Sequence, residues 1–141
     1  MSHIRNQLRR HEGVRHHSYR DSLGYTTIGV GRCIEKDVGL GLSNEEINIL
    51  LDNDIARCKE ELTNDYTWFE NLNPARQDAM INLCFNLGSP RLGRFYKSLA
   101  LMESGDFILA AAEFLNSRWA EQVGSRSIEV TDMIRTGSYQ R

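Results

Sequence analysis

The segment 73-NPARQDAMINLCFNLG-88 constrains the fold most, because it predicts a helix that must be buried on nearly all sides. Asn73 suits the N-cap, Pro74 suits the first helical position, and Gly88 suits the residue that ends a helix. Apolar side chains occupy nearly every face in between: Ala75, Ala79, Met80, Ile81, Leu83, Cys84, Phe85 and Leu87. Such a helix is normally surrounded by other elements, so the C-terminal half is predicted to form a helical lobe around it.

Other helices are predicted on both sides of this segment. Ser43 and Glu46 form a capping box, and apolar residues follow at helical spacing to position 62. At about 20 residues, or roughly 30 Å, this helix is long enough to join two lobes. A short helix is expected over residues 3–11, ending at Gly13, and further helices over 94–103, 106–115 and 125–135.

Residues 15–36 carry a different signal, which predicts a small antiparallel sheet. The segment 25-YTTI-28 favours a strand, and 22-SLG-24 favours a turn. Gly29 and Gly31 flank Val30, which indicates backbone that another group approaches closely. The residues after the sheet, 36-KDVGLGL-42, are expected to form a loop.

Length and composition favour one soluble domain with no membrane-spanning helix. The chain has 141 residues, and no apolar run approaches the ~18 residues that suggest a membrane helix. The N-terminus is basic but lacks the apolar stretch of a secretory signal. Cys33, Cys58 and Cys84 are odd in number and widely spaced, which favours free thiols over a disulfide scaffold or a zinc site.

Charge is distributed unevenly along the chain. The net charge is −2, but residues 1–32 carry six arginines against two acids, so this segment is +4 and the remainder is −6. A basic N-terminal face suits an anionic polymer, whereas the whole-chain charge argues against duplex nucleic acid as the main partner.

The stretch 11-HEGVRHHSYRDSLGYTTIGVGR-32 contains histidines and acids, but its spacing does not fit a metal site. A helical zinc motif needs a second histidine four residues after the first, and Arg15 stands at that position. His16 and His17 are adjacent and would point to opposite sides of a strand. Solvated surface histidines are the better interpretation.

Two carboxylates in this stretch are compatible with glycoside hydrolysis, which commonly uses a proton donor and a second acid. Glu12 lies at the end of the first predicted helix, where the dipole disfavours a negative charge. Asp21 lies in the turn, where an ionised group is solvated, and the Thr27 hydroxyl is able to hold a water molecule. Acids at helix ends and in turns are common, so spacing alone favours a hairpin without chemistry.

The same stretch resembles the catalytic segment of the phage-type lysozymes, glycoside hydrolase family 24. That segment has a Glu-Gly pair, an Asp nine positions after the Glu, and six positions later a Thr in a T-I-G-x-G hairpin. Here these are Glu12-Gly13, Asp21 and 27-TIGVG-31. The likeness continues through much of the chain, in 74-PARQDAMINLCFNLG-88, Phe95, 98-SL-99, 117-SRW-119, Gln122, Arg126 and 135-RTGSY-139.

The resemblance implies an α+β, lysozyme-like fold in a single domain spanning residues 1–141. A small antiparallel hairpin lobe (about 12–42) and a larger all-α lobe (63–141 plus 1–11) would be joined by a long helix (43–62), with a cleft between the lobes. No cofactor and no metal is implied.

The resemblance also implies a muramidase that hydrolyses the β-1,4 bond between N-acetylmuramic acid and N-acetylglucosamine in peptidoglycan, with inversion. Glu12 would be the general acid, Asp21 the anion that supports the transition state, and Thr27 the residue that places water. Arg126 would pair with Glu12 across the cleft. The supporting residues expected at the site or its wall are Gly29, Gly31, Asn82, Phe85 and Ser98.

A lysozyme of this type is expected to be a free-standing, monomeric endolysin. It would be made in the host cytoplasm without membrane insertion, be released through a holin-type pore, and act on the cell wall in the periplasm. Two positions depart from the family. Arg32 stands where many relatives have histidine, so any ion pair there is altered, and Glu113 stands at about the position of the family's sugar-contacting asparagine.

Two other functions remain open at this point. A lytic transglycosylase cleaves the same bond but needs no residue to place water, so Asp21 and Thr27 favour hydrolysis. A non-catalytic wall-binding module, or a structural piece of a phage particle, is the other alternative, because fold does not fix function.

Overall fold

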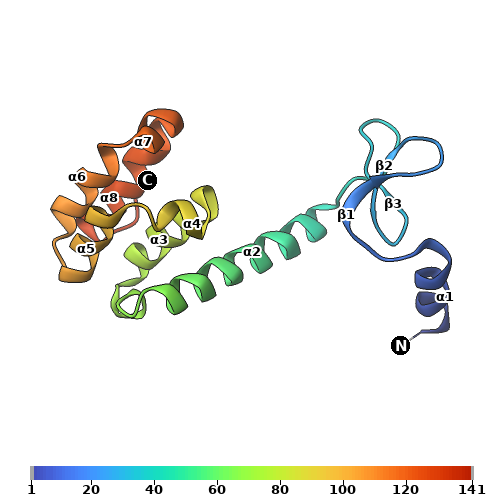
Figure 1. The fold of residues 1–141 in the computed structure, drawn as a ribbon, viewed down its shortest axis with the longest axis horizontal. Helices are drawn as coiled ribbons and strands as arrows, with labels where there is room; N and C mark the ends of the chain where they lie inside the picture. Colours follow the sequence, from blue (N-terminus) through green and yellow to red (C-terminus); the bar gives the residue numbers. More distant parts are fainter. Residues whose placement is uncertain (1, 141) are drawn as a thin grey trace. The chain divides into compact units, whose positions relative to one another are not determined.

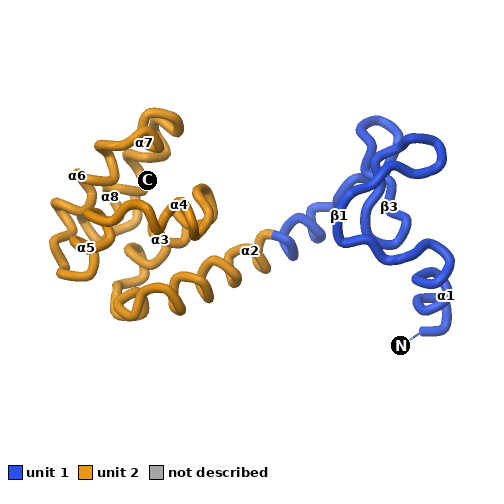
Figure 2. Tube along the Cα trace, in the orientation of Figure 1, with its two compact units in different colours: residues 1–50 blue, residues 51–141 orange. Residues whose placement is uncertain are grey.

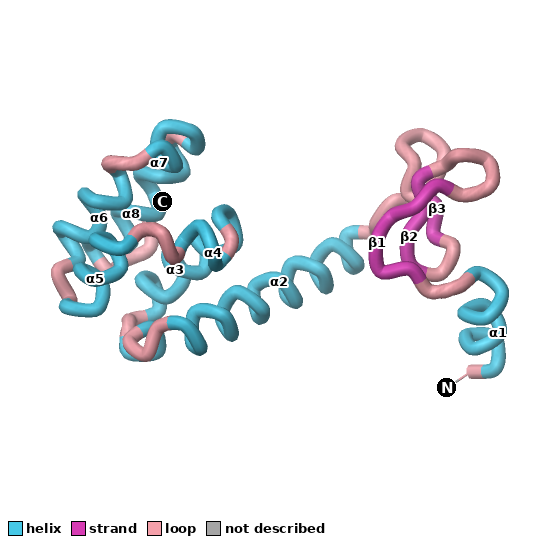
Figure 3. Tube along the Cα trace, in the orientation of Figure 1, coloured by secondary structure: helices cyan, strands magenta, loops and turns pink. Residues whose placement is uncertain are grey.

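The computed structural model describes residues 2–140 and divides the chain into two compact units, residues 1–50 and residues 51–141 (Figure 2). Unit 1 contains the small sheet, and unit 2 is helical (Figure 3), so the predicted α+β class is confirmed. The lobe boundaries at 42 and 62, and the assignment of residues 1–11 to the helical lobe, stay predictions. No helix within residues 2–140 is both long and apolar enough to cross a membrane.

Unit 1 begins with helix α1 (His3–Glu12), which matches the predicted helix over residues 3–11 (Figure 1). The Ser2 hydroxyl accepts a hydrogen bond from the Arg5 amide and caps the N-terminus. Gly13 ends the helix with φ of 77°, and its amide donates to the Arg9 carbonyl. Glu12 is therefore the last helical residue, next to a backbone conformation that L side chains rarely adopt.

The sheet consists of strands β1 (Arg15–Arg20), β2 (Thr26–Gly29) and β3 (Arg32–Cys33), antiparallel in that order. Tyr19 faces Thr27 across β1 and β2, and Thr27 faces Cys33 across β2 and β3. Thr27 therefore lies in the central strand, and at 3% exposure it is the most buried residue described between 2 and 50. The predicted antiparallel sheet is confirmed.

Helix α2 (Asn44–Asp65) begins at the predicted capping box. The Glu46 amide donates to the Ser43 hydroxyl at 3.1 Å, and the Ser43 amide donates to Oε1 of Glu46 at 2.9 Å. Arg32 reaches the same carboxylate from β3, with Nη1–Oε1 and Nη2–Oε2 both at 2.8 Å. Nη1 also donates to the Gly41 carbonyl at 3.0 Å. One arginine thus joins the sheet, the loop after it and the first turn of α2, all within unit 1.

Unit 2 contains the rest of α2 and a set of shorter helical elements: η1 (Phe69–Asn71), α3 (Pro74–Leu87), α4 (Ser89–Leu92), α5 (Tyr96–Ser104), α6 (Phe107–Leu115), α7 (Arg118–Val123) and α8 (Ser125–Thr136). The predictions for α3, α5, α6 and α8 are confirmed. The sequence did not predict η1, α4 or α7, because elements of three to six residues are too short to show helical periodicity.

The core of unit 2 surrounds α3, as its composition predicts. Ala79, Met80 and Leu83 of this helix have no exposed surface. Phe69 and Phe114, from elements before and after α3, are fully buried in the same cluster. Burial is incomplete on one side only, where Phe85 is exposed; that side lines a groove described below.

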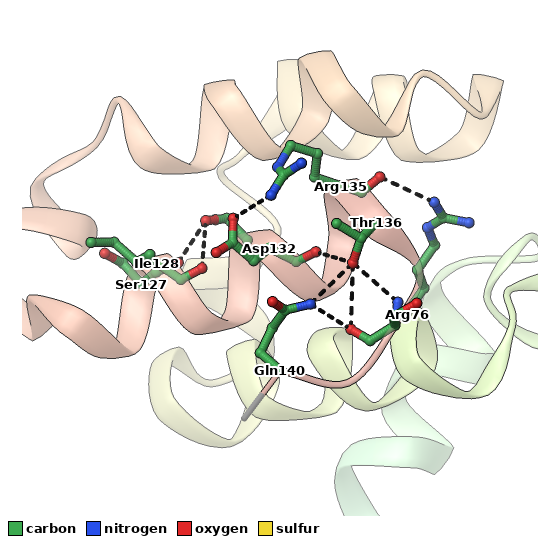
Figure 4. Close-up of polar contacts among 9 residues, drawn as sticks. Arg76, Ser127, Ile128, Asp132, Arg135, Thr136 and Gln140 are labelled. Carbon is green, nitrogen blue, oxygen red and sulfur yellow. Dashed lines mark hydrogen bonds and ion pairs between the residues drawn. The ribbon is translucent and has the colours of Figure 1, made fainter.

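The first turn of α3 also holds the C-terminal end of α8. Oδ1 of Asn73 caps α3 by accepting a hydrogen bond from the Arg76 backbone amide at 3.0 Å. The side-chain Nδ2 of Asn73 donates to the Gly137 carbonyl at 2.9 Å. Arg76 donates from Nε to the Ile134 carbonyl at 2.7 Å, and its guanidinium lies 3.7 Å from the centre of the Phe107 ring. Figure 4 shows Arg76 beside Arg135 and Thr136 at the end of α8. This arrangement fixes α8 and α6 against α3.

The Arg32–Glu46 ion pair predicts a pH dependence of stability. Hydrogen bonding and charge from Arg32, helped by Ser43, lower the pKa of Glu46 from 4.5 to about 2. A lowered pKa means that the stabilisation is present above pH 4.5 and is lost as pH falls toward 2. Urea unfolding should show Glu46→Gln less stable than wild type at pH 7 and pH 5, with the difference vanishing near pH 2. A difference independent of pH, or unaffected by 1 M salt, would contradict this assignment.

Candidate active site

The carboxylate of Glu12 lies directly against the backbone of Gly31. A Cβ atom added at Gly31 would be 2.8 Å from Oε2 of Glu12 and 3.0 Å from its Cδ. The prediction that another group approaches this glycine pair closely is therefore confirmed at Gly31, and the group is the proposed acid. Gly29 has a similar φ of 69°, but nothing lies within 4 Å of an added Cβ there. Glycine at position 29 serves backbone conformation alone.

The Asp21 carboxylate builds the turn between β1 and β2 with one of its two oxygens. Oδ1 accepts hydrogen bonds from the amides of Leu23 and Tyr25, both at 2.9 Å. The Asp21 amide donates to the Tyr25 carbonyl, and the Gly24 amide donates to the Asp21 carbonyl. Within residues 2–140, Oδ2 takes part in no hydrogen bond. The turn therefore holds the carboxylate rigidly and leaves one oxygen for a water molecule or a sugar.

The strand register places Thr27 on the same face of the sheet as Asp21. Asp21 bonds to Tyr25 across the hairpin and Tyr19 faces Thr27, so these positions share one side of the pleat. The Thr27 hydroxyl donates to the Tyr25 carbonyl at 2.9 Å. Because its single hydrogen is used there, the oxygen is left with acceptor capacity only. Asp21 and Thr27 thus present two acceptors on one face.

Two acids that the sequence analysis did not single out as site residues also bind the hairpin. Glu35 accepts from the amide and the hydroxyl of Thr26, at 3.3 and 3.4 Å, beside Thr27. Glu46 was recognised as a helix cap, but its pairing with Arg32 was not. These contacts join residues nine and fourteen positions apart, and no local pattern indicates them.

Three predicted residues of unit 2 come together in one groove. Arg126 donates from Nε and Nη2 to Oδ1 of Asn82, at 3.0 and 2.9 Å. Both residues and Phe85 line a groove of about 360 Å³, together with Leu51, Ile55, Asp78 and Ile81. The catalytic candidates Glu12, Asp21 and Thr27 belong to unit 1. The pairing of Arg126 with Glu12 stays a prediction.

Ser98 does not join this group. It is buried at 3% exposure beside a second groove of about 290 Å³ in unit 2, which Glu113 also lines. Arg94 and Lys97 line the same groove. The departure at Glu113 thus places an acid among cations on this surface.

The three thiols are free, and two of them are buried in the core. Cys58 and Cys84 are free and buried in the core of unit 2, and Cys33 is free and half-buried. Burial raises the pKa of Cys84 to about 12, so it remains a protonated thiol rather than a nucleophile. Within residues 2–140, no group of three or more His, Cys, Asp or Glu side chains is arranged to hold a metal ion.

Comparison with known proteins gives a consistent result. The family model described as phage lysozyme matches residues 9–133. A probable T4-type lysozyme of Dictyostelium discoideum is 29% identical over 98% of this chain and 96% of its own length. The pre-baseplate central spike protein of Enterobacteria phage T4 is 29% identical over 94% of this chain but 28% of its own length. An endolysin of Acyrthosiphon pisum secondary endosymbiont phage 1 is 29% identical over 85% of this chain and 80% of its own.

The two glycines of the hairpin offer a matched pair of substitutions. Gly29→Ala and Gly31→Ala each place a side chain at positive φ, which costs about 1–2 kcal/mol of stability. Only Gly31→Ala also displaces the Glu12 carboxylate. Urea unfolding should therefore show similar losses for both variants, whereas clearing of purified cell walls should fall much more for Gly31→Ala. Equal clearing by the two variants, at equal folded fraction, would show that the contact with Glu12 has no catalytic importance.

Proposed function

Because this chain belongs to the phage lysozyme family, we propose that Glu12, Asp21 and Thr27 carry out its hydrolysis of peptidoglycan. The protein is a lysozyme, a glycoside hydrolase of the endolysin type that cuts the bond between N-acetylmuramic acid and N-acetylglucosamine. One observation carries the assignment of roles: among residues 2–140, Oδ2 of Asp21 and Oγ1 of Thr27 accept no hydrogen bond, and both side chains lie on a single face of the hairpin.

Those two acceptors suit the placement of a nucleophilic water. Oδ2 of Asp21 and Oγ1 of Thr27 each accept one hydrogen of the same water, which leaves an oxygen lone pair to attack the anomeric carbon. As the new bond forms, Asp21 takes the proton that the water loses. Attack from the face opposite the leaving group inverts the anomeric configuration.

Glu12 acts on the other partner in the reaction, the leaving oxygen. Its proton passes to the glycosidic oxygen while the bond to the anomeric carbon breaks. The contact with Gly31 supports this role, because the backbone of Gly31 lies against one side of the Glu12 carboxyl group and limits its movement in that direction. Gly29 and Gly31 are supporting residues that shape the hairpin, and they have no chemistry of their own.

The grooves of unit 2 are proposed to bind the glycan strand and its peptides. Arg126, Asn82 and Phe85 offer donors, an amide and an aromatic surface in one groove. Ser98 lies by the second groove, where Arg94, Lys97 and Glu113 suit the mixed charges of a stem peptide.

The remaining proposals concern the setting of the enzyme. We propose a monomer made in the host cytoplasm and released through a holin-type pore to the periplasmic cell wall. The endolysin relative matches over most of both chains, which supports an enzyme of the endolysin type. The spike relative matches over a small part of its own length, so a lysozyme domain carried by a phage particle is the second candidate.

Replacing the proposed acid tests the mechanism directly. Glu12→Gln removes the proton donor with almost no change in shape, so it should stay folded and lose at least 100-fold in turnover, on the order expected of general acid catalysis. The measurement is turbidity of outer-membrane-stripped Gram-negative cell walls, followed by mass spectrometry of the fragments. Glu45→Gln, at an exposed acid of the same unit, is the matched control. Full activity of Glu12→Gln would refute the role, and anhydro fragments from wild type would establish a transglycosylase.

Thr27 permits a separate test of water placement. Thr27→Val keeps the shape of a buried side chain but removes the acceptor, whereas Thr27→Ser keeps the hydroxyl. Turnover should fall about tenfold or more in Thr27→Val and much less in Thr27→Ser. Nuclear magnetic resonance of the first product should show the α-anomer in wild type. The β-anomer as first product would contradict inversion.

A further inference from the structure

Arg32 occupies the position directly after Gly31, the residue on which the Glu12 carboxylate lies. Its backbone pairs with Ile28 across β2 and β3, so it closes the short Val30–Gly31 turn. Its side chain extends away to Glu46 and to the Gly41 carbonyl. The turn is therefore held from its C-terminal side by the arginine that departs from the family, through a partner, Glu46, that the sequence did not indicate.

Strand pairing holds the two ends of the turn, but the residues of the turn itself offer little surface for packing. Val30 and Gly31 are both exposed, and Gly31 has no side chain to pack. Gly29 and Gly31 both have positive φ, in a region where glycine is free to adopt many neighbouring conformations. A side-chain anchor at Arg32 consequently limits the freedom of the segment that contacts Glu12.

The Arg32 anchor differs from an ordinary surface ion pair. Two guanidinium nitrogens meet the two carboxylate oxygens at 2.8 Å, and a third hydrogen bond reaches Gly41. Glu46 is itself held by the Ser43 amide within the capping box. In contrast, Arg135 meets Asp132 in unit 2 through one contact of 3.1 Å. Two parallel hydrogen bonds of this kind fix the orientation of the guanidinium relative to the carboxylate and also add to their attraction.

We propose that Arg32 is a positioning residue for the reaction: through its ion pair with Glu46 it holds the Gly31 turn against the Glu12 carboxylate. The inference rests on the proposed role of Glu12 as the acid. Arg32 does not touch the substrate in this scheme. It acts through the backbone of Gly31. Its ion pair with Glu46 attaches the turn to the first turn of α2.

The test uses substitutions that change the ion pair and little else. Glu46→Gln retains a side chain that serves the capping box but loses the charge. Arg32→Lys keeps a positive charge without the two-point geometry. Asp132→Asn removes the simpler surface pair and serves as the matched control. Each full-length variant is assayed for kcat and KM on a soluble glycan from peptidoglycan, and for its unfolding midpoint.

The expected result is a kcat about tenfold lower in Glu46→Gln with KM within about twofold, because misplacing a reacting group by a fraction of an ångström lowers the rate rather than binding. Arg32→Lys should lower kcat less than Glu46→Gln does, and Asp132→Asn should leave kcat unchanged. If Glu46→Gln and Asp132→Asn lower the midpoint alike and neither alters kcat, Arg32 has a structural role only and the proposal is wrong.

A second readout does not depend on activity. The ¹³C resonance of the Glu12 carboxyl, followed through a pH titration, should differ between wild type and Glu46→Gln, and remain unchanged in Asp132→Asn. An unchanged Glu12 resonance in Glu46→Gln would overturn the proposal. If that resonance shifts but Glu12→Gln remains fully active, the anchor is present and the assignment of Glu12 as the acid has failed instead.

Discussion

The close approach of the Glu12 carboxylate to the backbone of Gly31 is the contact on which the proposed placement of the acid depends. A Cβ at position 31 would displace the carboxylate from this place, and Gly31 has a φ of 66° that other residues adopt with difficulty. The contact also requires α1 to end at Gly13, so that Glu12 is the last residue before the chain turns into β1. Helix end and hairpin turn are thereby linked by one carboxyl group that is also the candidate proton donor.

The hairpin uses its polar groups for structure and for chemistry at once. Asp21 shapes the turn with one oxygen and leaves the other unused, and Thr27 donates its hydrogen to a carbonyl and keeps its acceptor capacity. Neither side chain can reorient without breaking these bonds. The polar groups of such a site are already in place before substrate binds. Groups that need no rearrangement during the reaction commonly account for much of an enzyme's rate enhancement.

Unit 2 is stabilised differently. Its centre is apolar and fully buried around α3, and its polar contacts lie at the surface, where Asn73 and Arg76 hold the end of α8. Grooves form where apolar residues such as Phe85 lie beside Asn82 and Arg126. The helical unit thus carries the grooves proposed to bind the polymer, whereas the hairpin unit carries the candidate catalytic groups.

Much of this protein is determined by local sequence. Caps at Ser43 and Asn73, the glycine stops at Gly13 and Gly88, and the apolar periodicity of α3 specify the elements, because each acts within a few residues. The Glu-Gly, Asp and Thr spacing indicates the family and its candidate residues, and the Gly29–Gly31 pair indicates a close approach.

Tertiary structure alone decided which group makes that approach, and which partners complete the site. Glu12 reaches Gly31, Arg32 finds Glu46, Glu35 binds Thr26, and Arg126 meets Asn82 rather than lying near Ser98. These contacts join positions nine to forty-four residues apart. The physical reason is that neighbouring residues in the sequence set the backbone conformation at a position. Which residue a side chain contacts depends on how separate elements pack.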